Sequence, residues 1–229
     1  MVIEHHSLAD QIHLEIKRRI LTGELAQGER LHVELLAREL RVSQSPVKEA
    51  LKQLEIEGLI DIRPRSSTVV RSFSRREVRE LYATRVVIEP AAAALVVREG
   101  PASAALLEAL EANMEEMRQS TSGRDFVRPL AVTDTDSAFH RLIVRATGNR
   151  VLTRMHETLI DQAQLVRNYA SRGPRAVETL SEHQRIIDAL RAGDAAAACT
   201  VSINHLHAAE AVILETMETD PDFQESQRR

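Results

Sequence analysis

Residues 31–58 read LHVELLARELRVSQSPVKEALKQLEIEG, and they indicate how the first third of the chain folds. Two short amphipathic helices meet here at a tight turn. The first carries apolar residues at Leu35, Leu36 and Leu40, the chain turns at residues 41–43, and Pro46 is tolerated in the first turn of the second helix. This pattern predicts a helix-turn-helix, which places its second helix in a DNA groove. The predicted buried face of that helix consists of Val47, Ala50, Leu51, Leu54 and Gly58.

The opposite face of the second helix is polar and has little reason to be buried. Gln44 and Lys48 project together with Lys52 and Glu55, and a phosphate could bind the free backbone N–H groups at the start of this helix. Gln pairs best with adenine, and Lys offers a point charge, so both influence which bases are read. The predicted DNA-contacting residues are Arg38, Ser43, Gln44, Ser45, Lys48, Arg63, Arg65 and Ser66.

A predicted hairpin follows the two helices, because residues 59–63 and 68–71 read as short strands around residues 64–67. Helix pair and hairpin together make a winged helix-turn-helix. At this point the chain resembles the GntR family of bacterial transcription regulators, through LTGELAQGERL, LARELRVSQSPVKEAL and LEIEGLI. The resemblance covers about the first 72 residues. Gln44 and Lys48 stand where many members have arginines.

The charge composition is a caution for DNA binding, because the first domain is neutral and one copy would bind weakly. The chain has 229 residues, 43% apolar content and a formal charge of −4, enough for one small and one medium domain. Its first 73 residues hold eleven Lys and Arg against eleven Asp and Glu, so affinity must depend on charge placement. One neutral domain on one half-site binds weakly, which favours a homodimer on a two-fold operator of double-stranded DNA.

Several classes of protein are excluded by the same composition. The single Cys199 cannot form an internal disulfide. No apolar stretch is expected to reach the roughly 20 residues that cross a bilayer, and the first ten residues lack a signal-peptide core. We therefore expect a cytoplasmic protein without a membrane partner.

From residue 74 onward every signal is helical. Ser74 and Glu77 have the spacing of a capping box that opens a long helix. The predicted fold class is mainly α: a winged helix-turn-helix domain at 1–73, an all-α antiparallel bundle at 74–217 and a flexible polar tail at 218–229. Helices are expected at 75–98, 102–120, 126–146, 150–171, 176–191 and 195–217.

Three predicted helices deliver one Asp and three His to the core of the bundle. Asp136 and His140 lie four residues apart and so share one helix face. His183 and His205 each belong to an inward apolar stripe of another helix. One such His alone would be an ordinary core residue with one hydrogen bond. Burying all four unpaired would cost a few kcal/mol each, and one divalent cation, such as Zn²⁺, Ni²⁺ or another first-row ion, is an economical common partner.

The bundle also resembles a known domain. DTDSAFHRLIVRATGN, EHQRIIDALRAGD and NHLHAAEA are similar to the FCD effector domain of the FadR subfamily, which extends the resemblance to nearly the full chain. The resemblance implies that Asp136, His140, His183 and His205 bind a metal and that Arg85 pairs with an effector carboxylate. The remaining histidines are expected at the surface or in helix packing: His5, His6, His13, His32, His156 and His207.

We predict a ligand-responsive regulator, a repressor by default, that a small carboxylate or sugar acid releases from a palindromic operator by shifting the helix near 75–98. One alternative is a metal-dependent, hydrolase-like enzyme with an accessory winged-helix domain. The sequence lacks HExxH and a nucleophile elbow, and Glu182 beside His183 should face away from the ion. Another alternative is an adaptor protein, which salt-sensitive retention on heparin would count against.

Overall fold

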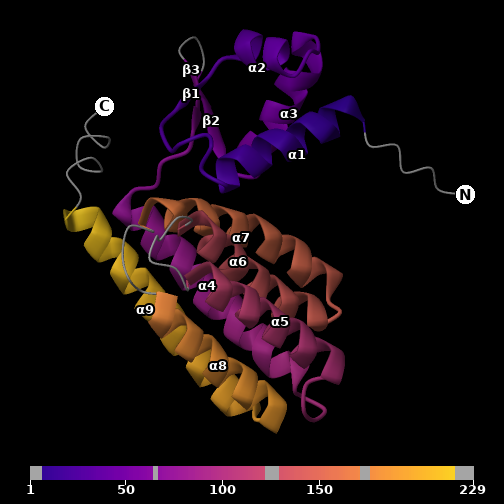
Figure 1. The fold of residues 1–229 in the computed structure, drawn as a ribbon, viewed down its shortest axis with the longest axis vertical. Coiled ribbons are helices and arrows are strands. Elements are labelled where there is room, and N and C mark those ends of the chain that lie inside the picture. The colour runs from indigo at the N-terminus through magenta and orange to yellow at the C-terminus, as the bar shows by residue number, and fades with distance from the viewer. Residues whose placement is uncertain (1–6, 64–66, 122–128, 171–175, 220–229) are drawn as a thin grey trace, which may run out of the picture. The chain divides into compact units, whose positions relative to one another are not determined.

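Two compact units make up the chain, Met1–Ser72 and Phe73–Arg229. The computed structural model describes residues 7–63, 67–121, 129–170 and 176–219, and the rest of the chain is a thin grey trace in Figure 1.

The first unit combines three helices with a small sheet. Its elements are α1 (Leu8–Leu21), β1 (Arg30–Leu31), α2 (Val33–Glu39), α3 (Gln44–Ile56), β2 (Ile60–Arg63) and β3 (Ser67–Val70). α1 packs against α3, and Ile16, Ile20, Val47 and Leu54 are fully buried between the elements. This is the predicted winged helix-turn-helix.

The sheet contains one strand that sequence reasoning missed. Its order is β1-β3-β2 with antiparallel neighbours, and Arg30 of β1 pairs with Val69 of β3. Just before β1, the Gly28 N–H donates to the Val70 carbonyl at 2.9 Å. Two residues are too few to show the alternation that predicts a strand, so β1 is defined only by its pairing with β3.

The ends of α3 fix the direction of the predicted recognition helix. Ser43 is its N-cap residue, and Gly58 follows its C-terminus with a φ of 70°. The Leu59 N–H donates to the Leu54 carbonyl at 3.0 Å and closes this end of the helix.

The expected apolar face of α2 is wrong in one position. Leu35 is exposed, and the buried residues of α2 are Leu36 and Ala37, because only one side of this two-turn helix meets α3.

In the second unit, every described helix lies close to its predicted place. These are α4 (Arg75–Val96), α5 (Ala104–Thr121), α6 (Pro129–Ala146), α7 (Arg150–Ala170), α8 (Ala176–Ala192) and α9 (Ala195–Thr219). The predicted capping box of α4 is present, because the Glu77 N–H donates to Ser74 Oγ and the Ser74 N–H donates to Glu77 Oε2.

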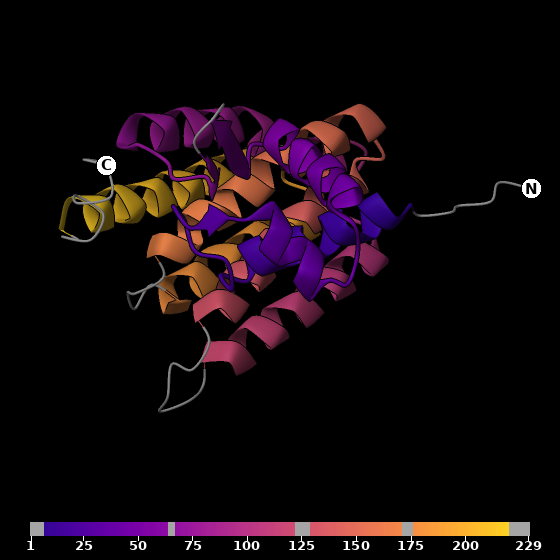
Figure 2. The same ribbon diagram turned by 90° about the horizontal axis from the view of Figure 1, so that it is seen from above.

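The helices of the second unit form a bundle (Figures 1 and 2). α4 runs along α9, α5 packs against α6 and α8, and α6 packs against α7. A continuous core fills the space between them, and it includes Leu110, Phe139, Ile187 and Leu190. α6, α8 and α9 all contribute to this interior, which is where the predicted metal ligands lie.

α9 corrects the expectation that no segment could span a bilayer. Its 25 residues are long and apolar enough for a membrane span by length and composition alone. A core helix of a helical domain passes the same test, and α9 contacts α4, α7 and α8 and buries Ala198, His205 and Ile213. Only 28% of its apolar window is buried among the described residues, so packing in the bundle covers part of this helix.

Candidate metal centre

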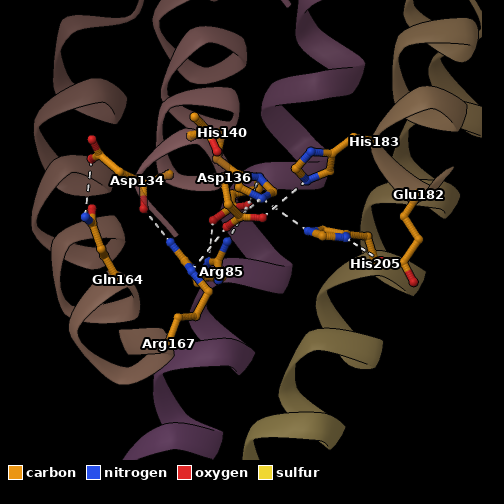
Figure 3. A network of polar contacts seen from close by, with 12 residues as sticks. Arg85, Asp134, Asp136, His140, Gln164, Arg167, Glu182, His183 and His205 are labelled. Carbon is orange, nitrogen blue, oxygen red and sulfur yellow. Dashed lines mark hydrogen bonds and ion pairs between the residues drawn. The ribbon is translucent and has the colours of Figure 1, made fainter. Parts of the chain in front are cut away.

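Four buried side chains from three helices converge in the interior of the bundle (Figure 3). Asp136 and His140 come from α6, one turn apart, His183 comes from α8 and His205 from α9. One ligand atom from each lies within 4.8 Å of the ligand atoms of the other three. The structure thus brings together the four residues that the sequence singled out.

Two of the spacings between these atoms fit the coordination of a divalent ion. His140 Nε2 lies 3.2 Å from His205 Nε2, and His183 Nε2 lies 3.4 Å from Asp136 Oδ1. Ligands that bind one ion at roughly 2.0–2.2 Å are about 3–3.5 Å apart. Both ring nitrogens of His183 are buried and make no hydrogen bond within the described residues. A metal would give Nε2 of His183 a bond in place of the hydrogen bond that it lacks among these residues.

The electrostatics favour the metal-binding forms of Asp136, His183 and His205. Burial opposes ionisation of Asp136, but the Arg167 guanidinium and the neighbouring imidazoles outweigh this and hold the pKa of Asp136 below its usual range. Burial lowers the pKa of His183, and it also lowers the pKa of His205 against the opposing effect of Glu182. Ionised carboxylate and neutral imidazole are the forms that coordinate a metal.

Arg85 is buried in this region, but it already has a partner that sequence reasoning missed. Its Nε donates to Glu89 Oε1 at 2.6 Å, one turn further along α4. Glu89 Oε2 in turn lies 2.8 Å from His140 Nδ1, so Arg85 is linked to a metal ligand through one carboxylate. The spacing of Arg85 and Glu89 by four residues was a usable signal, because it places both on one helix face.

A second arginine adjoins the centre from α7. Arg167 Nε lies 3.2 Å from Asp136 Oδ2, and its guanidinium also bonds Ser137 Oγ. Nearby, Gln164 donates to Asp134 Oδ1 at 3.3 Å (Figure 3). Arg167 follows the buried Ile160 and Ala163 at helical spacing, so the inward face of α7 could have indicated it.

Glu182 lies outside the set of four ligands, as its position next to His183 in the sequence predicted. Its Oε2 lies 2.7 Å from His205 Nδ1, the nitrogen on the far side of that ring from the centre.

Two of the remaining histidines are buried beside carboxylates: His13 at Glu57 and His156 at Glu89. His32 and His207 are exposed, and His5 and His6 lie outside the described residues.

The predicted DNA-contacting residues that can be placed are all exposed. They are Arg38 on α2, Ser43 at the N-cap of α3, and Gln44, Ser45 and Lys48 in the first turns of α3. The Ser43 side chain makes no capping hydrogen bond, which leaves first-turn N–H groups available to another acceptor. Arg63 ends β2 but its side chain is not described, and Arg65 and Ser66 lie outside the described residues.

Comparison with known proteins agrees with this architecture. An uncharacterized HTH-type transcriptional regulator of Bacillus subtilis, YdhC, is 30% identical over 79% of this chain and 80% of its own length. A protein of Paenarthrobacter nicotinovorans, named as a probable D-xylose utilization operon transcriptional repressor, is 30% identical over 82% of this chain and 80% of its own. The solved structure of E. coli McbR/YncC superposes with a TM-score of 0.79 at 22% identity, covering 92% of this chain and 99% of that one.

Both units match known protein families. Residues 80–208 match the FCD domain, and residues 8–70 match the bacterial regulatory proteins of the gntR family. These are domains of DNA-binding regulators that respond to small molecules, so the hydrolase-like alternative has no support. The winged helix-turn-helix followed by an FCD bundle identifies this chain as a transcription regulator of the GntR family, with a FadR-like domain arrangement.

Proposed function

We propose that this regulator is a homodimer that represses from a palindromic operator and is released by a small carboxylate or sugar acid bound at a metal-containing site. The observation that carries the proposal is the buried cluster of Asp136, His140, His183 and His205 beside the buried Arg85 and the partly buried Arg167. A metal and two guanidiniums are the groups that proteins use to bind carboxylates. One relative is named for a sugar-utilization operon, so sugar acids belong among the compounds to test.

The metal we propose is Zn²⁺, Ni²⁺ or a similar first-row ion. Three imidazole nitrogens and one carboxylate oxygen suit such ions better than Mg²⁺ or Ca²⁺, which prefer oxygen ligands. When bound, the ion supplies a positive charge that an effector oxygen can meet. Arg85 and Arg167 are the side chains of this chain that would hold the effector carboxylate, through bidentate hydrogen bonds. Arg85 must then share its guanidinium between Glu89 and the effector.

The DNA interface we propose is the exposed polar face of α3 with the wing. Lys48 and Gln44 would read base edges from the start of α3, while Ser43 and Ser45 bind phosphate together with the free backbone N–H groups. Arg38, Arg63, Arg65 and Ser66 would contact the backbone or the minor groove beside it. As a DNA-binding regulator with this domain arrangement, the protein is expected to act in the cytoplasm.

The dimer interface we propose is the apolar outer face of α4 and α7. Val87 and Leu95 on α4 are exposed, as are Val151 and Met155 on α7. Val87 and Leu95 are eight residues apart on α4, with the exposed Ala91 midway between them. Val151 and Met155 are four residues apart on α7. Each pair therefore shares one helix face. α4 and α7 contact each other. Apolar surface concentrated on two neighbouring helices is typical of an isologous two-fold interface.

The proposal is tested by thermal unfolding with a panel of carboxylates and sugar acids, before and after chelation and with metal restored. One compound that raises the midpoint only in the metal-loaded protein would identify the effector class. The same compound should then release the protein from operator DNA. If chelation and every compound leave the midpoint unchanged, the four-residue metal site is wrong. If only chelation lowers it, the metal is structural and the effector lies outside the panel.

A further inference from the structure

The three metal-binding imidazoles differ in what meets their outer nitrogens. His140 Nδ1 lies 2.8 Å from Glu89 Oε2, and His205 Nδ1 lies 2.7 Å from Glu182 Oε2. His183 Nδ1 is buried without a hydrogen bond among the described residues. Its ring instead stacks on Phe139, with centroids 3.8 Å apart and planes inclined by 4°. Two rings are therefore held by carboxylates and one by an aromatic face.

A carboxylate behind an imidazole decides where the ring carries its proton. An ionised carboxylate only accepts hydrogen bonds, so the nitrogen that faces it must be the N–H donor. Glu89 and Glu182 thus place the proton of each ring on Nδ1 and leave a lone pair on Nε2. His140 Nε2 and His205 Nε2 face each other at 3.2 Å. Two lone pairs at this distance repel, and a cation between the rings converts that repulsion into coordination.

Glu89 is held from three sides, so its position is well defined. Besides His140, it accepts from Arg85 Nε at 2.6 Å and lies 3.3 Å from His156 Nε2. These contacts come from α4, α6 and α7 and involve both carboxylate oxygens of Glu89. Glu182 is more accessible, with 17% of its side chain exposed, and it comes from α8.

We propose that Glu89 and Glu182 are positioning residues of the metal site, which orient His140 and His205 and fix their Nε2 atoms as the metal-binding nitrogens. The inference rests on the proposed metal site and adds two residues that do not touch the ion. Outer carboxylates of this kind raise the basicity of a metal-binding imidazole, and their removal costs about 10- to 100-fold in metal affinity.

The decisive experiment compares the Zn²⁺ and Co²⁺ affinities of Glu182→Ala, Glu182→Gln and the wild-type chain by competition with a coloured chelator. Glu182→Ala should bind both ions about 10- to 100-fold more weakly. Glu182→Gln should fall between, because its amide oxygen still accepts from Nδ1–H but carries no charge. Glu178→Ala is the matched control, since Glu178 is exposed one turn earlier on α8, and it should bind as wild type does.

A second readout separates positioning from general stability. Nitrogen NMR of the metal-free protein should place the His205 proton on Nδ1 in the wild type and Glu178→Ala, but not in Glu182→Ala. Glu89→Gln tests the other ring, with the exposed Glu80→Gln as its control on α4. Glutamine is chosen at 89 because alanine would leave Arg85 buried without a partner. If Glu89→Gln fails to fold, the Glu182 series decides the question alone.

The possible failures are distinguishable. Wild-type affinity and an unchanged tautomer in folded Glu182→Ala would overturn the inference while leaving the metal site intact. Absence of Zn²⁺ or Co²⁺ binding by the wild-type chain would overturn the proposed metal site itself.

Discussion

Arg167 Nε on α7 lies 3.2 Å from Asp136 Oδ2 on α6, so the one carboxylate in the candidate ligand set already faces a cation. Its other oxygen, Oδ1, faces His183 at 3.4 Å. The two oxygens of Asp136 thus serve different partners, one toward α7 and one toward the proposed ion. Arg167 stabilises the metal-free bundle by neutralising a buried charge.

Arg167→Met should make the protein more dependent on its metal. The change leaves Asp136 buried without its guanidinium, which costs about 3–5 kcal/mol when no other cation is present. A bound metal supplies another cation, so the unfolding midpoint should fall more after chelation in this variant than in the wild type. Thermal unfolding with and without chelator measures the difference. Arg191→Met, which removes an exposed ion pair with Glu111, should show no such dependence; equal behaviour of the two variants would refute the assigned role.

His140→Ala should abolish stabilisation by metal. The substitution removes one of four ligands and also the partner of Glu89, so added Zn²⁺ should no longer raise the midpoint. At a metal concentration about 100 times the dissociation constant, the wild type should gain roughly 2.7 kcal/mol. His207→Ala on the exposed side of α9 serves as the control. A metal response retained by His140→Ala would place the ion elsewhere.

Lys48→Ala should weaken operator binding and leave the metal response unchanged. Lys48 is exposed on α3, and loss of a base contact costs about 1–3 kcal/mol, whereas loss of a phosphate contact lowers the salt dependence by about one unit of slope. Fluorescence anisotropy with labelled operator DNA over a range of salt concentrations distinguishes the two. Arg98→Ala, an exposed change in the FCD domain, should bind DNA as wild type does. Unchanged operator affinity in Lys48→Ala would show that the assigned face of α3 is wrong.

Val87→Glu combined with Met155→Glu should convert the proposed dimer to a monomer. Each change puts a charge on the exposed apolar face of α4 or α7, where burial in an interface without a partner is costly. Light scattering after size-exclusion chromatography should report half the wild-type mass. Leu14→Glu, on an exposed position of α1, should leave the mass unchanged. A double variant with wild-type mass would locate the interface on other surfaces.

Glu57→Gln should reduce the loss of stability at acid pH. Burial alone would raise the pKa of Glu57, but His13 and Lys17, at 2.8 and 3.0 Å from its oxygens, outweigh this and lower the pKa from its ordinary value of 4.5. A carboxyl with a lowered pKa stabilises the folded state above the unfolded pKa and loses that contribution as pH falls through the folded value. Urea unfolding from pH 7 to pH 3 should therefore show a shallower decline in the variant below about pH 4.5. Exposed Glu49→Gln should follow the wild type, and parallel curves for all three proteins would contradict the prediction.

Local patterns predicted the elements well, because caps and helical periodicity are properties of neighbouring residues. The capping box of Ser74 and Glu77 and the inward stripes of α6, α8 and α9 are examples, and the latter brought Asp136, His140, His183 and His205 together. Contacts across the bundle could not be predicted in the same way. Periodicity says that a side chain points inward, but it does not say which side chain of another helix it meets. The outer contacts of Glu89, Glu182 and Arg167 were missed for this reason. β1 was missed because its two residues are too few to show the alternation of a strand.

The buried groups around the candidate metal centre are balanced before any ion binds. The carboxylates of Asp136 and Glu89 are offset by the guanidiniums of Arg167 and Arg85. A divalent cation would leave this interior with an excess of positive charge, of which Glu182 at the edge offsets only part. Low-polarity surroundings make such an excess unfavourable, and an anion is the species that relieves it. In the proposed site, the metal would thus turn a charge-balanced interior into one that favours anions, so that metal supply would determine whether an acidic effector binds.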